Sequence, residues 1–219
     1  MLETGEFVQR LGSERATAIL RTDDHETARS AMAAAIRGGF RIVEFTLTVP
    51  GALDLIEEFA ARGDVVVGAG TVLGAAEARA CVGRGASFLV SPITDEDVIR
   101  TANELGVASI PGAHTPTELV RAQRAGAPLQ KLFPAPAGGP SYVRACLGPL
   151  PSLRIVPTSG VDATNAAEFL AAGAFAVGFV APLFQPEWLA RRDFAAIEAR
   201  ARELLGLVAA APRRGRARE

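Results

Sequence analysis

The sequence predicts one (β/α)₈ barrel preceded by a short N-terminal helix. Short apolar segments alternate eight times with longer segments of helical character along the 219 residues. The apolar segments are nearly continuous runs, which is typical of parallel strands buried on both faces. The length suits a compact barrel of this class. An open doubly wound sheet is the rival fold, but no Gly-x-Gly-x-x-Gly string follows the first expected strand at residues 17–20.

The elements follow one another in a regular order. Strands are expected at 17–20, 42–45, 65–69, 88–90, 107–110, 129–133, 154–156 and 175–180. Helices are expected at 24–37, 51–61, 75–84, from about 95, from 115, at 141–147, at 165–172 and as one long helix over 186–207. The fifth of these helices opens at Thr115 with an N-cap, a proline at the first helical position and Glu118 at the third. Residues 1–208 are therefore expected to form one domain, and the Arg-rich residues 209–219 a disordered tail.

Composition and charge exclude several classes of protein. The formal net charge of −1 leaves no basic footprint for nucleic acid or an anionic membrane, although a weak polyanion contact of the tail stays an alternative. No apolar run approaches the roughly 18 residues of a membrane span, and the first residues do not resemble a signal peptide. Cys81 and Cys146 lie far apart, and His25 and His114 share no metal-ligand spacing with them. We expect a cytoplasmic protein without a metal or other cofactor.

Lys131 is the most informative residue of the chain. It is the only lysine among 23 Lys and Arg residues, so arginine serves wherever a plain cation suffices. An amine can lose its proton and attack a carbonyl carbon, whereas a guanidinium stays charged. Lys131 lies in an apolar run that ends at Pro134, and burial there would lower its pKa. The alternative is a coding bias toward arginine together with one snorkelling surface lysine.

Glu44 is the second candidate for chemistry. It lies inside the second expected strand, where a carboxylate is unfavourable unless it is paired or has a function. The alternation of a strand places Ile42 and Glu44 on the inward face, so the carboxylate would enter the mouth of the barrel near the Lys131 amine. Such a pair supplies a nucleophile and a proton carrier. The alternative is an ion pair between Glu44 and an arginine of a helix.

Small or conformationally special residues follow several other strands. In a barrel the loops after the strands meet at one end, so these residues would surround the mouth with hydroxyl and backbone N–H groups. Taken singly, each is an ordinary turn. Arg21, directly after the first strand, could hold a carboxylate with its planar fork. The others are Thr71, Ser91-Pro92, Pro111-Gly112 and Thr158-Ser159-Gly160.

With these residues in place, the chain resembles the bacterial KDPG/KHG aldolase family. Those proteins are class I aldolases acting on 2-dehydro-3-deoxy-6-phosphogluconate (KDPG) and 4-hydroxy-2-oxoglutarate (KHG). The matching strings occur in the family's order over about residues 15 to 184. They are AILR (18–21), VEFTLTVP (43–50), GAGTV (68–72), VSP (90–92), IPGA (110–113), TPTE (115–118), KLFPA (131–135) and PT (157–158).

The resemblance implies a role for each matching residue. Lys131 corresponds to the lysine that forms the Schiff base, and Glu44 to the general acid and base. Arg21, Thr71 and Pro92 correspond to positions lining the pyruvyl part of the site. The resemblance also implies a homotrimer in carbohydrate metabolism of the Entner–Doudoroff type. Its reaction releases pyruvate and an aldehyde from a 2-oxo acid, without a metal.

Three departures from the family pattern concern the other end of the substrate. Thr48 stands where many members carry an arginine, and Ser159 stands where the usual Pro-Thr-Gly-Gly has a glycine. The eighth strand normally ends Gly-x-Gly-Ser, but here Val180 and Ala181 replace the last Gly and Ser, and Pro182 follows. These changes weaken the phosphate site formed with Thr158 and Gly160. We therefore hypothesise a non-phosphorylated, apolar-ended or small acceptor such as glyoxylate.

Two other classes of function compete with this interpretation. A phosphate-binding barrel such as thiamine phosphate synthase or an isomerase would need a glycine-rich phosphate loop after strands seven and eight, and none is visible in the sequence. A barrel that binds a 2-oxo acid without turning it over is compatible with the altered phosphate loop. The presence of both Glu44 and Lys131 argues against that second class.

Overall fold

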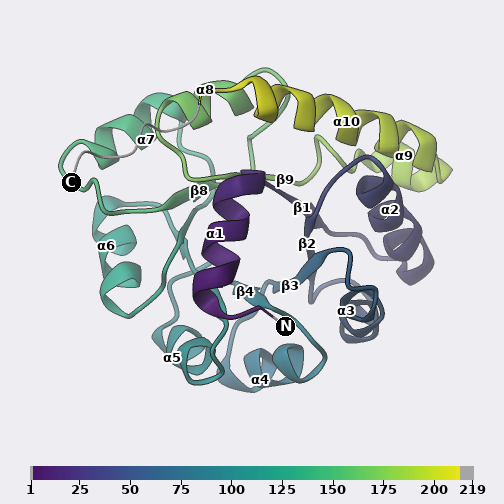
Figure 1. The fold of residues 1–219 in the computed structure, drawn as a ribbon, viewed down its shortest axis with the longest axis horizontal. Helices are drawn as coiled ribbons and strands as arrows, with labels where there is room; N and C mark the ends of the chain where they lie inside the picture. Colours follow the sequence, from purple (N-terminus) through teal and green to yellow (C-terminus); the bar gives the residue numbers. More distant parts are fainter. Residues whose placement is uncertain (1, 213–219) are drawn as a thin grey trace.

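The computed structural model describes residues 2–212, and these form the expected barrel. Figure 1 looks along the barrel, with the strands in the middle, α2 to α10 around them and α1 across the centre. All strand pairings are parallel. The strands are β1 (Ala16–Leu20), β2 (Ile42–Thr46), β3 (Val66–Gly70), β4 (Phe88–Val90), β5 (Ala108–Ile110), β6 (Gly112–Ala113), β7 (Gln130–Leu132), β8 (Ile155–Pro157) and β9 (Val177–Phe179).

The strand order closes on itself. One run of neighbours is β5-β4-β3-β2-β1-β9 and the other is β6-β7-β8. Pro111 separates β5 from β6, which are two pieces of the fifth barrel strand, and its carbonyl oxygen accepts a hydrogen bond from the backbone of Lys131 at 2.9 Å. A bridge between Thr158 and Gly178 joins β8 to β9. The predicted (β/α)₈ barrel is thereby confirmed.

All helices except the first cover the outside of the barrel, and most begin where the sequence predicts. They are α1 (Thr4–Glu14), α2 (His25–Arg37), α3 (Ala52–Ala61), α4 (Ala75–Gly83), α5 (Glu96–Glu104), α6 (Pro116–Arg124), α7 (Gly139–Leu147), α8 (Ala166–Ala171), α9 (Pro186–Arg191) and α10 (Phe194–Ala210). Thr115 and Glu118 form the expected capping box of α6. The prediction of one long helix over 186–207 was wrong. Arg192 takes a left-handed conformation that ends α9, and Asp193 caps α10 by accepting from the backbone N–H of Ala196.

The end of α10 is attached to the start of β1. The buried Arg15 side chain donates hydrogen bonds to the backbone carbonyl oxygens of Val208, Ala211 and Pro212. Residues 209 and 210, expected in the tail, are the last residues of α10, and residues 213–219 lie outside the described part of the chain. Within residues 2–212, no helix has the length and apolar character needed to cross a bilayer.

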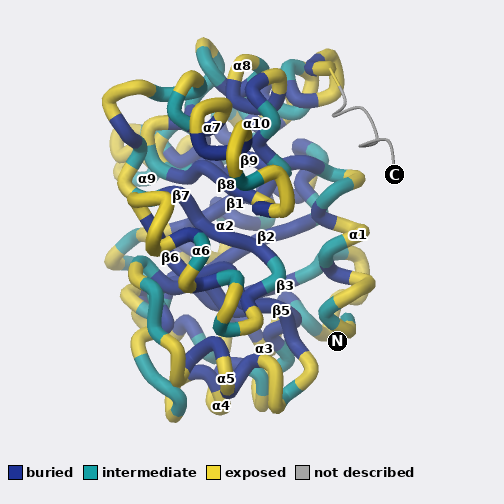
Figure 2. The backbone as a smooth tube through the Cα atoms, turned by 90° about the vertical axis from the view of Figure 1, so that its left-hand side faces the viewer, coloured by how far each residue is buried: buried dark blue, intermediate teal, exposed yellow. Residues whose placement is uncertain are grey.

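The inside of the barrel is filled from its N-terminal end. Phe7 of α1 stacks on Phe88 of β4 with ring centroids 4.5 Å apart, and Ile42, Ala108 and Val156 belong to the same buried cluster. Figure 2 shows α1 at the right-hand end of the barrel, with the buried strands beside it toward the middle of the view. Because apolar side chains and α1 close this end, the opposite end, where the strands terminate, is left for the site.

Candidate active site

Lys131 lies in the middle of β7, in register with Gly112 and Val156. Its neighbour two residues back, Leu129, belongs to the cluster inside the barrel, so the Lys131 side chain also points inward. The residue is only 9% exposed, and its Nζ lies 4.8 Å from the centroid of the Phe133 ring. The alternative of a snorkelling surface lysine is therefore wrong.

Glu44 faces the same interior from β2, where it is in register with Ile19 and Gly68. It is 1% exposed, and its Oε1 atom has no hydrogen-bond partner in the described structure. None of the ion pairs among residues 2–212 includes Glu44, so the alternative of an ion pair with a helix arginine is wrong as well. A buried carboxyl without a fixed partner can exchange a proton with a bound molecule.

Burial favours the uncharged forms of both groups. It raises the pKa of Glu44, while the positive charges of Lys131 and Arg21 act in the opposite direction. Burial lowers the pKa of Lys131, the Glu44 carboxylate opposes this, and the Arg21 guanidinium lowers it further. An amine that loses its proton more easily is a better nucleophile near neutral pH, and a carboxyl that keeps its proton longer is a better acid.

Gly70, which the sequence analysis did not single out, lies directly against Glu44. A Cβ atom on Gly70 would overlap Oε1 of Glu44, so the carboxylate rests over the bare backbone of β3. Glycine inside a strand often marks such a close approach, and the glycines at 68 and 70 were the available signal. Gly70 thus fixes where the carboxylate can lie.

Arg21 and Thr71 meet at the mouth, as the sequence predicts. The Nη2 atom of Arg21 donates a hydrogen bond of 3.2 Å to Oγ1 of Thr71. Thr71 directly follows β3 and has a φ of 60°, which turns the chain sharply there. The charge of Arg21 lowers the pKa of both Lys131 and Glu44, so its guanidinium lies close enough to act on the pair.

Pro92 and Thr158 lie on two other sides of the lysine strand. The carbonyl group of Pro92 packs so closely on Gly112 that a Cβ there would overlap it, and Gly112 is the register partner of Lys131. Thr158 is 2% exposed and follows Val156 on the inward face of β8, and its Oγ1 has no hydrogen-bond partner in the described residues. Pro92 therefore lies next to β6, the neighbour of the lysine strand, and Thr158 directly after β8, its other neighbour.

The residues expected at the phosphate end fall into two groups. Ser159 and Gly160 form the turn after β8, with φ values of 63° and 75°, and the Gly160 carbonyl accepts a hydrogen bond from the Asn165 side chain. Thr48, Val180 and Ala181 instead line a separate cavity of about 770 Å³, which also borders Arg21. We call this space the mouth cavity. Neither Ser159 nor Gly160 lines it.

A clamp that the sequence analysis missed holds the loop after β7. The Nδ1 atom of His114 forms a hydrogen bond of 3.0 Å with the carbonyl oxygen of Pro134, and the Tyr142 hydroxyl donates to the carbonyl oxygen of His114 at 2.5 Å. The two aromatic rings also stack. Because Phe133 precedes Pro134, the clamp helps to place the Phe133 ring beside the Lys131 amine. Only the tertiary structure brings residues 114, 134 and 142 together.

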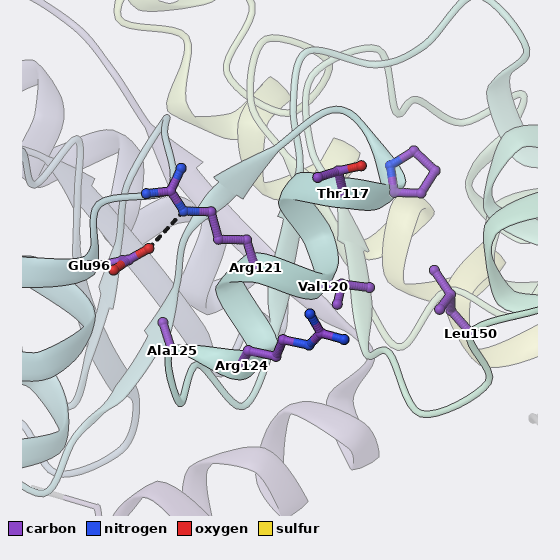
Figure 3. Close-up of a pocket in the computed structure, with 8 residues that line it drawn as sticks. Glu96, Thr117, Val120, Arg121, Arg124, Ala125 and Leu150 are labelled. Carbon is purple, nitrogen blue, oxygen red and sulfur yellow. Dashed lines mark hydrogen bonds and ion pairs between the residues drawn. The ribbon is translucent and has the colours of Figure 1, made fainter.

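A second hollow lies on the outside of α6, remote from the expected residues. Figure 3 shows it, with the Glu96–Arg121 ion pair at one side and Leu150 at the other. None of the predicted site residues lines it. Among residues 2–212, no group of three or more His, Cys, Asp or Glu side chains is placed to hold a metal ion.

Comparison with known proteins decides the family. The model of the family "KDPG and KHG aldolase" matches residues 8–200. The chain belongs to the KDPG/KHG aldolase family. The 2-dehydro-3-deoxy-phosphogluconate aldolase of Pseudoalteromonas atlantica is 39% identical over 139 residues, which are 63% of this chain and 65% of that protein. The resemblance inferred from the motifs is confirmed.

Two further members show the range of the family. The probable 2-dehydro-3-deoxy-6-phosphogalactonate aldolase of Rhizobium meliloti is 37% identical over 172 residues, covering 77% of this chain and 81% of that protein. The KDPG aldolase of Legionella pneumophila has been solved with pyruvate captured as a covalent carbinolamine. It is 26% identical, has a TM-score of 0.78 and covers 88% of this chain and 97% of its own. One member of this family of class I carbon–carbon lyases thus binds pyruvate covalently.

Proposed function

We propose that this protein is a Schiff-base aldolase that cleaves a 2-oxo-3-deoxy acid into pyruvate and an aldehyde. One observation supports the proposal above all. Lys131, the only lysine, and Glu44, whose Oε1 atom has no hydrogen-bond partner in the described structure, are both buried inside the barrel. Burial favours the neutral amine that attacks a carbonyl and the protonated carboxyl that donates to a leaving oxygen.

The first half of the reaction joins the substrate to Lys131. The neutral Nζ attacks C2 of the 2-oxo acid, and the carbonyl oxygen becomes the hydroxyl of a carbinolamine. Glu44, as a carboxylic acid, protonates that hydroxyl, which leaves as water. The nitrogen lone pair then forms the C=N bond of an iminium ion, and Glu44 is left as a carboxylate.

The second half breaks the carbon–carbon bond. The Glu44 carboxylate takes the proton of the C4 hydroxyl, the C3–C4 electron pair moves to the iminium to form an enamine, and C4 leaves as the aldehyde. Glu44 then returns the proton to C3. The water released earlier is balanced by the one that hydrolyses the iminium, so the products are pyruvate, the aldehyde and the free Lys131 amine.

Arg21 and its neighbours have the chemistry to orient the pyruvyl part. A guanidinium binds a carboxylate through two parallel hydrogen bonds, and Arg21 is already held at the mouth by Thr71. Pro92 would bound the site beside β6, and the free Thr158 hydroxyl would hydrogen-bond the substrate. A substrate whose carboxylate binds Arg21 would then present its C2 carbonyl to Lys131.

The named relatives differ in substrate, with names derived from phosphogluconate and from phosphogalactonate, and our proposal is for the shared reaction on a 2-oxo-3-deoxy acid. The family's homotrimeric assembly, an Entner–Doudoroff type of role, a cytoplasmic location and a single domain over residues 1–208 are proposed along with the activity. Sedimentation equilibrium, with three chains per particle expected, tests the assembly separately from the chemistry.

Steady-state pyruvate release tests the proposed function. The substrates are KDPG, its galactonate epimer, KHG and dephosphorylated KDPG, and the variants are Lys131→Ala and Lys131→Arg. We expect release from at least one substrate by the wild type and none above background by either variant, because a guanidinium keeps the charge but forms no Schiff base. A folded wild type that binds pyruvate and releases none would favour the non-catalytic binding barrel instead.

A further inference from the structure

The mouth cavity has no role in the lysine chemistry described above. Its walls come from three neighbouring segments: residues 21–27 after β1, Thr48 after β2, and residues 180–192 after β9. Neither Lys131 nor Glu44 lines it. Arg21 connects the two spaces, since it borders the cavity and its charge reaches both Lys131 and Glu44.

The wall formed after β9 is apolar. This wall consists of small, aliphatic and aromatic side chains from the loop after β9 and from α9. They are Val180, Ala181, Phe184, Pro186, Leu189 and Ala190. Leu189 is half-buried and packs against the main hydrophobic core, so the wall is fixed in place. Apolar surface of this kind gains from contact with an apolar ligand.

The charged residues of the cavity cancel one another. The two positive charges of the lining arginines are balanced by two negative charges, so the formal net charge of the cavity wall is zero. These residues are Arg21, Arg192, Asp23 and Asp24. Asp24 is 3.6 Å from the Arg192 guanidinium and also caps α2 by accepting from the backbone N–H of Thr27. Since Asp24 already engages Arg192, the cavity offers a phosphate dianion little positive charge.

The backbone after β9 is also poorly suited to an anion. In the loops that follow the last two strands, many barrels bind phosphate with free N–H groups. Here the N–H groups of Leu183 and Phe184 both donate to the carbonyl oxygen of Val180, at 3.1 and 2.9 Å. Pro182 has no N–H. Three consecutive residues of this loop therefore present no donor to a ligand.

We infer that the mouth cavity is the subsite for the chain of the acceptor aldehyde and that it takes an uncharged, aliphatic chain. The inference rests on the proposed aldolase function, because it concerns the partner that reacts with enzyme-bound pyruvate. In the direction of synthesis, C3 of the enamine attacks the aldehyde carbon, and the aldehyde oxygen takes the proton of Glu44. Hydrolysis of the iminium then releases a 4-hydroxy-2-oxo acid whose alkyl end has lain in the cavity.

Aldol addition with a graded series of aldehydes tests the subsite. Pyruvate is held fixed, and kcat/KM is measured for glyoxylate, glyceraldehyde 3-phosphate and the straight-chain aldehydes from ethanal to hexanal. We expect kcat/KM to rise about threefold for each added methylene, because each one is removed from water. A flat series, or a kcat/KM for glyceraldehyde 3-phosphate ten times that for hexanal, would overturn the inference.

A matched pair of substitutions locates the effect. Leu189 lines the mouth cavity and Leu150 lines the hollow of Figure 3, and both are half-buried against the same core. We expect Leu189→Lys to lower the ratio of kcat/KM for hexanal to kcat/KM for glyoxylate at least tenfold, and Leu150→Lys to leave this ratio unchanged. If the two variants respond alike, the subsite is elsewhere and the inference fails.

A separate readout distinguishes failure of the subsite from failure of the aldolase proposal. Pyruvate and sodium borohydride trap the Schiff base without any aldehyde. An adduct on Lys131 together with a flat aldehyde series would overturn the subsite and leave the aldolase proposal standing. A folded wild type that forms no adduct would overturn both.

Discussion

The two ends of the barrel interior are built on opposite principles. At the N-terminal end, α1 closes the barrel and the Phe7 ring stacks on Phe88 within an apolar cluster. At the C-terminal end, Lys131 and Glu44 are buried, and the polar atoms Oε1 of Glu44 and Oγ1 of Thr158 have no hydrogen-bond partner in the described residues. An unsatisfied buried polar group costs about 1–3 kcal/mol. The first end stabilises the fold, and the second is ready to receive a polar ligand.

The residues that stabilise the fold and the residues proposed for chemistry are thus separated along the barrel axis. The same β-strands contribute residues to both ends, so positions only a few residues apart on one strand belong to different ends. Substitutions at the two ends should therefore have opposite consequences for stability and for turnover.

The largest expected effect is that of Lys131→Met, which should lower pyruvate release by at least about 10⁴-fold because the nucleophile is lost. It should also raise the melting temperature by about 3 °C or more, since methionine fills the site without a buried amine. Calorimetry at pH 7 checks the shift, and a fall in melting temperature would contradict the comparison.

The lowered pKa of Lys131 also makes the stability of the wild type depend on pH. Between the lowered pKa of the folded state and the ordinary pKa of lysine, the unfolded chain binds more protons, so the wild type gains stability as the pH rises through this range.

Phe7→Ala should do the reverse at the other end. Loss of the ring from the closed end of the barrel is expected to destabilise the fold by about 3–5 kcal/mol. Below the unfolding transition, kcat should stay within about threefold of the wild type, because Phe7 belongs to α1, which closes the end of the barrel opposite to Lys131 and Glu44. Urea denaturation and steady-state kinetics on the same preparation measure both quantities. A loss of kcat that exceeds the loss of folded protein would show that the two ends are not separable.

Gly70→Ala should have a smaller effect confined to chemistry. The new Cβ would displace the Glu44 carboxylate, and a misplaced proton carrier typically slows turnover by about 10- to 100-fold. Gly74→Ala is the matched control, because Gly74 has an extended backbone in the same strand-to-helix segment and no atom within 4 Å of an added Cβ. Equal kcat values for the two variants would remove Gly70 as a positioning residue.

The smallest expected effect concerns pH. Schiff-base formation needs the neutral amine, so its rate falls on the acid side of the pKa of Lys131. This acid limb should lie well below the pH range in which an ordinary lysine titrates, because burial lowers the pKa of Lys131. In Glu44→Gln the limb should move to still lower pH, since the Glu44 carboxylate is the group that raises the pKa of Lys131. Stopped-flow measurements across pH 5 to 9 follow the limb, and a shift toward higher pH in the variant would contradict the electrostatic argument.

The sequence predicts the barrel and the two buried side chains of the proposed site because their signals are local. Alternating apolar runs, one lysine and one acid within a strand need no knowledge of distant contacts. The contact of Gly70 with Glu44 depends on the register between β2 and β3, and the His114–Tyr142 clamp joins α7 to the loops after β6 and β7. The break between α9 and α10 rests on one left-handed arginine, a conformation that residue type does not predict.

The most direct test is the site of covalent attachment. Wild type and Lys131→Ala are incubated with pyruvate and sodium borohydride, and the adduct is located by intact mass followed by peptide mapping. The account predicts one reduced pyruvyl group on the wild type, carried by the peptide containing Lys131, and none on the variant. An adduct that persists in Lys131→Ala, or no adduct on folded wild type, would contradict the assignment of Lys131 as the nucleophile.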